Sequence, residues 1–171
     1  AENNPDVDAI FRLINEKINI KFKNYKVSLG GALSPFNSQN TIWHNSIFEL
    51  MYLPVTCSMR CTDIWRSLIA LKLMKLNKKE ILFFGTTMYQ NRNQHNLIND
   101  FNLEIPIYLK DKFLIEKLNG IKLKKGLKNL PDNLKKCYKI LIENKIFHKK
   151  ELYYLNAWLK DCEKLRKKIT L

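Results

Sequence analysis

The spacing of apolar residues changes along the chain, and it predicts short strands first and helices later. Apolar and polar residues alternate over residues 18–22, and a second apolar stretch covers residues 25–29. Both patterns are typical of short β-strands. Gly30 and Gly31 end the second strand, where glycine permits a positive φ or the close approach of another segment. Residues 81–84 form an apolar run that predicts a third strand.

Helix signals stand between these strands. Residues 4–13 begin with a proline and acidic residues, as the first turn of a helix does. A polar loop precedes a short helix expected near residues 44–51. A longer helix is expected to start at Thr62, which can cap it, with Asp63 in the first turn. Its apolar face holds four residues at helical spacing: Ile64, Leu68, Leu71 and Met74. Residues 96–101 predict only a helical turn before Pro106.

After about residue 111 the pattern is helical to the end of the chain. The expected core-facing residues are Leu134, Tyr138, Leu141 and Ile142 in one helix and Leu152, Leu155, Trp158, Leu159 and Leu165 in the next. Gly120 and Pro131 mark the breaks between these helices. The sequence therefore predicts mixed α/β structure over the first two-thirds and a helical tail.

Composition is that of a folded domain, with 46% hydrophobic residues and no apolar run long enough to cross a bilayer. Four cysteines without a zinc-like spacing predict buried, reduced thiols and hence a reducing, cytoplasmic compartment. The formal charge of +14 fits nucleic acid, an anionic membrane surface or phosphate-bearing substrates. Nucleic acid is disfavoured, because many lysines of the tail alternate with apolar residues as on the solvated side of a helix.

Residues 36–101 concentrate side chains that suit a polar ligand. Amides offer directional hydrogen bonds to sugar hydroxyls, aromatic rings offer flat faces, and arginine matches phosphate. The candidate substrate-binding residues are Asn37, Gln39, Asn40, Arg60, Trp65, Arg66, Gln90, Arg92 and Asn93. Trp65 and Trp43 fit a core position as well as a sugar platform, and core is the favoured interpretation.

Asp63 is the sharpest catalytic candidate. A carboxylate in the first turn of a helix, flanked by Arg60 and Arg66, can accept the proton of a sugar hydroxyl. The alternative is a carboxylate that only stabilises the helix start and pairs with an arginine. His95 is a candidate metal or diphosphate ligand, against the alternative of an exposed histidine in a polar loop.

Several of these residues carry a resemblance to a known family. The motifs are Pro-Phe-Asn-Ser-Gln-Asn-Thr at residues 35–41, Leu-Pro-Val-Thr at 53–56, Arg-x-Thr-Asp-Ile-Trp-Arg-Ser at 60–67 and Tyr-Gln-x-Arg-Asn-x-His at 89–95. In this order they resemble the STELLO family, which comprises plant Golgi proteins and relatives in nematodes and bacteria that are regarded as glycosyltransferases. Residues 4–9 are also similar to bacterial members and to proteins of the UDP-arabinopyranose mutase type.

The resemblance implies a GT-A-like, Rossmann-like fold. In such enzymes an N-terminal half binds the nucleotide-sugar and supplies an Asp-x-Asp-type motif for a divalent metal, Mn or Mg. The C-terminal half builds the acceptor site, with an acidic residue at a helix start and sometimes a late histidine on the metal. Carried over to this sequence, the catalytic residue is Asp63 and the metal ligand is His95. The implied parts are an acceptor-side, catalytic part at residues 1–109 and a basic helical extension at 110–171.

This chain lacks the nucleotide-binding half, so the resemblance implies the C-terminal portion of a longer enzyme, inactive alone. A stand-alone relative that has lost the donor site is the other interpretation. The expected activity is sugar transfer from a nucleotide-sugar to a glycan or lipid-linked acceptor in a bacterial cell, with peripheral contact to the inner face of the membrane. The rival hypothesis is a non-enzymatic basic helical module that binds nucleic acid or anionic membrane. It would use the lysines of the tail with Tyr138, Tyr153, Tyr154 and Trp158 as stacking groups.

Overall fold

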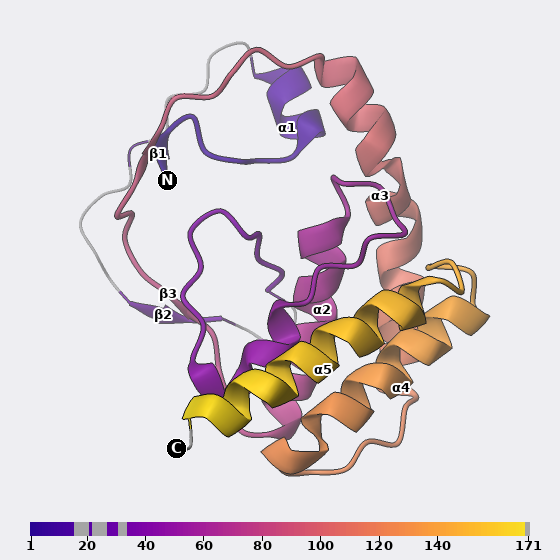
Figure 1. Ribbon diagram of the computed structural model, residues 1–171. Coiled ribbons are helices and arrows are strands. Elements are labelled where there is room, and N and C mark those ends of the chain that lie inside the picture. The colour runs from indigo at the N-terminus through magenta and orange to yellow at the C-terminus, as the bar shows by residue number, and fades with distance from the viewer. Residues whose placement is uncertain (16–20, 22–26, 31–33, 170–171) are drawn as a thin grey trace.

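Helices make up most of the computed structural model, which describes residues 1–15, 21, 27–30 and 34–169 (Figure 1). The strands are β1 (Glu2–Asn3), β2 (Ser28–Leu29), β3 (Leu82–Phe83) and β4 (Tyr89–Gln90). The α-helices are α1 (Ala9–Ile14), α2 (Thr62–Leu76), α3 (Leu97–Asn119), α4 (Leu130–Glu143) and α5 (Glu151–Ile169). Two 3-10 helices complete the set, η1 (Asn45–Met51) and η2 (Leu127–Asn129).

Two small strand pairs are the only sheets among the residues that the structure describes. β1 pairs with β4 in parallel, and β2 pairs with β3 in antiparallel orientation. β2 and β3 fall within the runs expected at residues 25–29 and 81–84, whereas the strand expected at 18–22 lies outside the described residues, except for residue 21. The described part of the chain is thus more helical than the mixed α/β expectation, and no Rossmann-like sheet is found in it.

The structure corrects the extent of the helix expected at residues 96–101. Instead of a single turn at residues 96–101, α3 begins after its cap Asn96, whose side chain accepts from the backbone N of Asn99 at 3.0 Å, and it continues through the proline. Leu114 and Leu118 are buried beyond the proline and Glu104 before it, so packing along one face outweighs the hydrogen bond that proline cannot donate. α3 also runs across the boundary expected between residues 109 and 110, which therefore does not coincide with a break in the helix.

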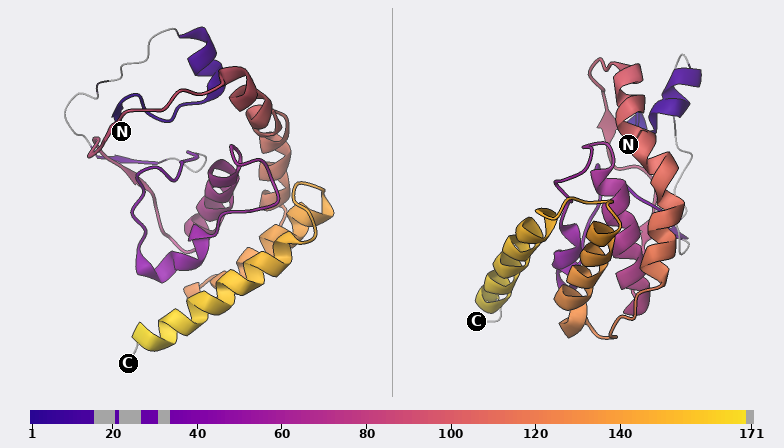
Figure 2. Two further views of the ribbon diagram at one scale, coloured as in Figure 1. Left: turned by 45° about the horizontal axis from the view of Figure 1, so that its top comes forward. Right: turned by 90° about the vertical axis from the view of Figure 1, so that its right-hand side faces the viewer.

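The core is built around α2. The expected apolar residues Leu68, Leu71 and Met74 are buried, as are the flanking Trp65 and Ile69. The right-hand view of Figure 2 shows α5, α4, α2 and α3 in succession, so α2 packs between α3 and α4. One continuous set of buried residues extends from the loop before η1 to α5, which joins both sides of the expected boundary.

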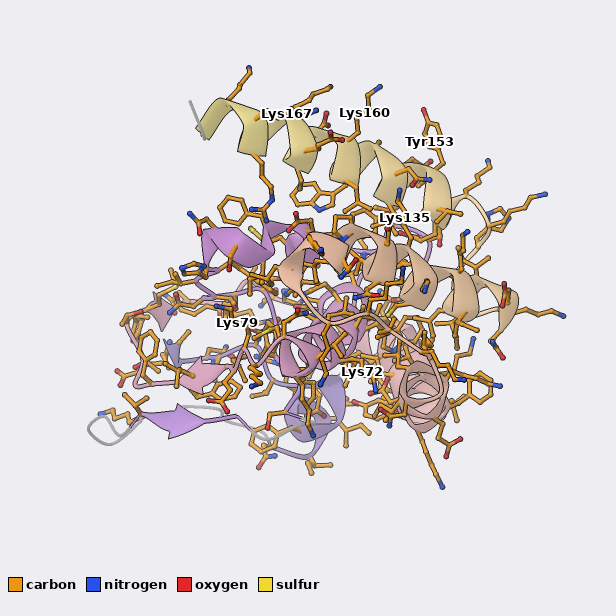
Figure 3. All side chains as sticks on the ribbon, turned by 90° about the horizontal axis from the view of Figure 1, so that it is seen from below. Lys72, Lys79, Lys135, Tyr153, Lys160 and Lys167 are labelled. Carbon is orange, nitrogen blue, oxygen red and sulfur yellow. The ribbon has the colours of Figure 1, made fainter. Side chains whose placement is uncertain are left out.

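The tail helices bury five of the nine residues that the sequence expects to face the core. Leu134, Tyr138 and Leu141 of α4 are buried, and so are Leu155 and Leu159 of α5. The other four expected residues are less buried: Ile142, Leu152 and Trp158 are half-buried against the core, and Leu165 is 52% exposed. Figure 3 shows Tyr153, Lys160 and Lys167 extending from the outer side of α5, away from α4, as expected for the solvated side of a helix.

Gly30 is required by a close approach between β2 and β3. Its backbone N donates to the backbone O of Ile81 at 2.8 Å, and a Cβ added there would overlap Ile81 Cγ2 and lie 2.9 Å from Phe83 Cε2. We expect Gly30→Ala to lower the free energy of unfolding by about 1–3 kcal/mol, because the branched Ile81 side chain cannot yield without leaving its rotamer. Gly120→Ala is the matched control, since its Cβ would meet nothing closer than 3.6 Å. Equal denaturation midpoints for the two variants in urea would contradict this prediction.

Candidate functional site

A pocket of about 380 Å³ opens where the N-terminal segment, the start of α2 and the middle of α3 meet. We call it the acidic pocket, because five carboxylates line it: Asp6, Asp8, Asp63, Glu104 and Asp111. Arg60 and Tyr108 are part of the same wall. Figure 1 shows α1 beside the upper part of α3, with α2 next to α3 below it.

Asp63 lies in the first turn of α2, as the sequence predicts, and lines the acidic pocket. Its Oδ2 accepts from the backbone N of Ser38 at 3.0 Å, while Oδ1 has no hydrogen-bond partner among the described residues. The expected cap is wrong, because Cys61 is the N-cap and the Thr62 hydroxyl donates to the backbone O of Met59 at 3.1 Å. Asp63 is therefore held by one oxygen, while its other oxygen has no hydrogen-bond partner among the described residues.

Arg60 is surrounded by carboxylates. Its Nε and Nη2 donate to Glu104 Oε1 at 3.0 and 2.6 Å, and its guanidinium lies 3.7 Å from Asp6 Oδ1 and 4.0 Å from Asp100 Oδ2. Burial lowers the pKa of Arg60, but the bond to Glu104 and the neighbouring charges outweigh it, and the net shift is upward. The charge of Arg60 is thus neutralised within the protein, which weakens its candidacy as a phosphate ligand.

Arg66 lies behind the pocket wall. It is 3% exposed, its Nη2 donates to Ser38 Oγ at 2.8 Å, and its guanidinium stacks on Phe36 and Trp43 at 5.3 and 4.9 Å from the ring centroids. Burial lowers its pKa, and the nearby Asp63 partly opposes that shift. Arg66 therefore connects Ser38, and through it Asp63, to the aromatic residues of the adjoining loop.

Trp65 is placed as the core anchor that the sequence favoured. It is 2% exposed, its ring packs edge-on against Phe147, and its Nε1 donates to Asp111 Oδ1 at 2.7 Å. Burial raises the pKa of Asp111, and the bond from Trp65 partly offsets this rise. The indole thus reaches the acidic pocket only through Asp111.

The amide candidates gather at a second, larger pocket of about 680 Å³. We call it the apolar pocket, since its walls are Phe36, Ile42, Trp43, Ile47, Met74 and residues 81–84. Gln39 Nε2 donates to Gln90 Oε1, and Asn40 Nδ2 donates to Thr87 Oγ1 at 2.9 Å. Asn37 lines both pockets, and its Oδ1 accepts from the backbone N of Gln39 at 3.2 Å. These amides mainly hold the loops together.

Arg92, Asn93 and His95 lie on the segment between β4 and α3. Arg92 pairs with Asp6, Asn93 is exposed, and His95 Nδ1 lies 3.3 Å from Asp100 Oδ2. No group of three or more histidine, cysteine or acidic side chains among the described residues is placed to hold a metal ion. His95 with Asp100 alone does not make a complete metal site. The residues that the structure describes therefore do not fit the divalent metal by themselves.

Five polar residues of the acidic pocket were not predicted from the sequence: Asp6, Asp8, Glu104, Tyr108 and Asp111. The last three are spaced by four and three residues, so they share one face of α3. Because only a turn was expected at residues 96–101 and a helix only after about residue 111, this polar face was not recognised. Burial and the carboxylates of Asp8 and Glu104 raise the pKa of Tyr108, whose hydroxyl lies 3.2 Å from Glu104 Oε2.

Of the four aromatics expected for a nucleic-acid module, Tyr138 is in the core and Trp158 is half-buried against it. Tyr138 is 1% exposed, and Trp158 Nε1 donates to the backbone O of Glu49 at 3.1 Å. Tyr153 and Tyr154 are exposed. Because Tyr138 and Trp158 pack into or against the core, the tail exposes little aromatic surface on which bases could stack. Among the described residues, no helix combines the length and the apolar character that crossing a membrane requires.

The cysteines are reduced. Cys61, Cys137 and Cys162 are buried and Cys57 is half-buried, all four as free thiols. Burial raises the pKa of Cys57 to about 12 and of Cys61 to about 11. The prediction of buried thiols is confirmed for Cys61, Cys137 and Cys162.

Comparison with known proteins points to one family. A family model described as STELLO glycosyltransferases matches residues 60–170. A relative from Arabidopsis thaliana, described as "Probable glycosyltransferase STELLO1", is 38% identical over 69 residues, which is 36% of this chain and 9% of that protein. The chain thus covers less than a tenth of that relative's length. No solved structure matches significantly. The matched range includes Arg60, Asp63 and His95 but begins after the loop at 37–41.

Proposed function

Because the chain belongs to the STELLO glycosyltransferase family, we propose that it forms the acceptor-side, catalytic part of a glycosyltransferase. The donor in this proposal is a nucleotide-sugar, and the acceptor is a hydroxyl of a glycan or of a lipid-linked glycan. The donor site, with a GT-A-like nucleotide-binding half and its Mn or Mg ion, would belong to a longer enzyme. On its own the chain would be inactive.

The observation that carries the proposal is the placement of Asp63. One carboxylate oxygen is fixed by the backbone N of Ser38, the other has no hydrogen-bond partner among the described residues, and Asp63 lines the acidic pocket. A base must be held in place and yet keep a lone pair for the proton it takes. The Ser38 bond meets the first requirement, and the unbonded Oδ1 meets the second.

The proposed step is acid–base chemistry at one hydroxyl. Asp63 Oδ1 takes the proton of the acceptor hydroxyl as its oxygen attacks the anomeric carbon of the donor. The new C–O bond forms while the bond to the diphosphate breaks, and the diphosphate leaves with the electron pair. Asp111, with one oxygen engaged by Trp65, lies in the same pocket and would orient the acceptor.

The test compares Asp63→Asn with wild type in a longer protein that includes a donor-binding half. We expect sugar transfer, measured as kcat/KM, to fall about 100-fold, because asparagine cannot accept the proton. Asp161→Asn is the matched control, since Asp161 is exposed on α5 and pairs only with Lys164. Transfer unchanged in Asp63→Asn would remove Asp63 from the mechanism, and a protein that neither transfers nor hydrolyses a nucleotide-sugar would contradict the proposed activity.

A further inference from the structure

The apolar pocket and the acidic pocket adjoin. They share three lining residues, Asp6, Pro35 and Asn37. We propose that the apolar pocket binds the hydrocarbon part of an amphiphilic acceptor, whose hydroxyl reaches Asp63 in the acidic pocket. This inference rests on the proposed function and names the class of acceptor, a sugar attached to an apolar chain.

Size and lining suit a hydrocarbon group. A volume of about 680 Å³ lies within the range of small-molecule sites, which are typically lined by apolar and aromatic side chains. The accessible part of the wall includes Ile42, Leu82, Phe83 and Phe84, which are between 38% and 87% exposed. A hydrocarbon that covers exposed apolar side chains in such a hollow removes apolar surface from water, which favours binding.

The polar rim of the apolar pocket is already occupied by bonds within the protein. Asn40 donates to Thr87, Gln39 donates to Gln90, and the Thr41 hydroxyl donates to the backbone O of Asn37 at 2.9 Å. A bare sugar needs several such groups to replace its bonds to water. The rim therefore favours a ligand that needs few hydrogen bonds from the protein.

Charge also argues against an anionic ligand here. The side chains that carry charge around the pocket are Lys79, Glu80 and Asp6. Asp6 is paired with Arg92 and lies 3.7 Å from Arg60, and Lys79 and Glu80 have opposite signs. Ala1 adds one amino group to the lining, so the positive and negative charges of the described lining residues balance, and no surplus of positive charge favours a phosphate group.

The route from one pocket to the other passes along the loop at residues 35–38. Phe36 lies at the apolar end under the Arg66 guanidinium, and Ser38 binds Asp63 at the other. Asn37 lies between them and lines both pockets. A sugar joined to a chain in the apolar pocket would thus be presented to Asp63.

The experiment measures binding without turnover, so that its failure is distinct from failure of the proposed function. The 171-residue chain is titrated with n-octyl-β-D-glucoside below its micelle concentration, and separately with glucose, while tryptophan emission is recorded. Trp43 lines the pocket and Trp65 is buried, so Trp43→Phe identifies the reporting residue. We expect saturable binding of the octyl glucoside and at least tenfold weaker binding of glucose.

Exposed wall residues then locate the site. Phe84→Ser removes a 55% exposed ring from the pocket and should weaken octyl glucoside binding about tenfold. Leu109→Ser on α3 is the matched control, since Leu109 is 75% exposed and outside both pockets. Equal binding of octyl glucoside and glucose, or an unaffected Phe84→Ser, overturns the inference. Loss of binding in a longer protein, whose other parts then cover the pocket, overturns it as well.

Discussion

Replacing Glu151 with alanine should lower the free energy of unfolding by about 3–5 kcal/mol, because it leaves a set of buried hydrogen-bond donors without an acceptor. Glu151 is the first residue of α5 and is 0% exposed. Its carboxylate accepts from the Tyr52 hydroxyl at 2.5 Å, the backbone N of Val55 at 3.1 Å, and both the backbone N and the hydroxyl of Thr56, at 2.8 and 2.5 Å. Alanine removes the acceptor and leaves these groups without a partner.

Chemical denaturation in urea measures this change as a shift in midpoint at constant slope. Glu151→Gln keeps one carbonyl oxygen but turns its NH₂ group toward other donors, so its urea midpoint should lie between those of wild type and Glu151→Ala. Glu163→Ala is the control on the same helix, because Glu163 pairs only with Lys167 at the surface. An unchanged midpoint for Glu151→Ala would mean that water enters and replaces the carboxylate.

This network explains the motif at residues 53–56 without a ligand. The backbone of Val55 and Thr56 is bound to α5, and the Thr56 hydroxyl also accepts from the backbone N of His148 at 3.1 Å. The loop that leads into α2 is therefore fixed by a residue nearly a hundred positions later. The motif contributes to the family resemblance, but its partner could not be predicted from the sequence because Glu151 is distant in the chain.

Local patterns predicted what depends on neighbours in sequence. α2 follows from the apolar spacing after Asp63, and the Asp63 position in its first turn follows from the same pattern. The roles of the arginines could not be predicted in the same way. The partners of Arg60 come from residues 6, 100 and 104, and the rings that cover Arg66 come from a loop more than twenty residues earlier.

The length of α3 shows how packing overrides a local rule. Pro106 predicts a break, because it cannot donate a backbone hydrogen bond. The helix continues because it has a buried partner on each side of the proline: Glu104 is bound to the backbone N of Ala9, and Leu114 is fully buried. The same error hid the acidic pocket, since one of its walls is formed by Glu104, Ile107, Tyr108 and Asp111 on the part of α3 that was not expected to be helical.

Glu104→Ala should be the second most damaging change, lowering the free energy of unfolding by about 2–4 kcal/mol. Glu104 is 4% exposed and joins three segments. Its Oε1 accepts from Arg60, and its Oε2 accepts from the backbone N of Ala9 at 2.7 Å and the Tyr108 hydroxyl at 3.2 Å. Without it Arg60 keeps only the weaker contacts to Asp6 and Asp100, at 3.7 and 4.0 Å.

Two variants separate charge from packing in this prediction. Glu116→Ala on the exposed side of α3 controls for the loss of a glutamate from the helix and should leave the urea midpoint unchanged. Adding Arg60→Met to Glu104→Ala should recover part of the loss, because it removes the cation that the first change leaves unpaired. Simple additivity of the two single changes would show that Arg60 and Glu104 are not coupled, contrary to their contact of 2.6 Å.

Amide exchange gives a local readout of the same contact. Ala9 is 0% exposed, and its backbone N–H donates to Glu104. In Glu104→Ala, the hydrogen exchange of this N–H should therefore accelerate more than that of the α5 amides. That pattern would mean that α1 loosens from α3 while the core around α4 and α5 stays folded. The acidic pocket would then lose the wall formed by Asp6 and Asp8, although Asp63 keeps its bond to Ser38. Uniform acceleration along the chain would instead show that Glu104 stabilises the whole fold and has no special part in shaping the pocket.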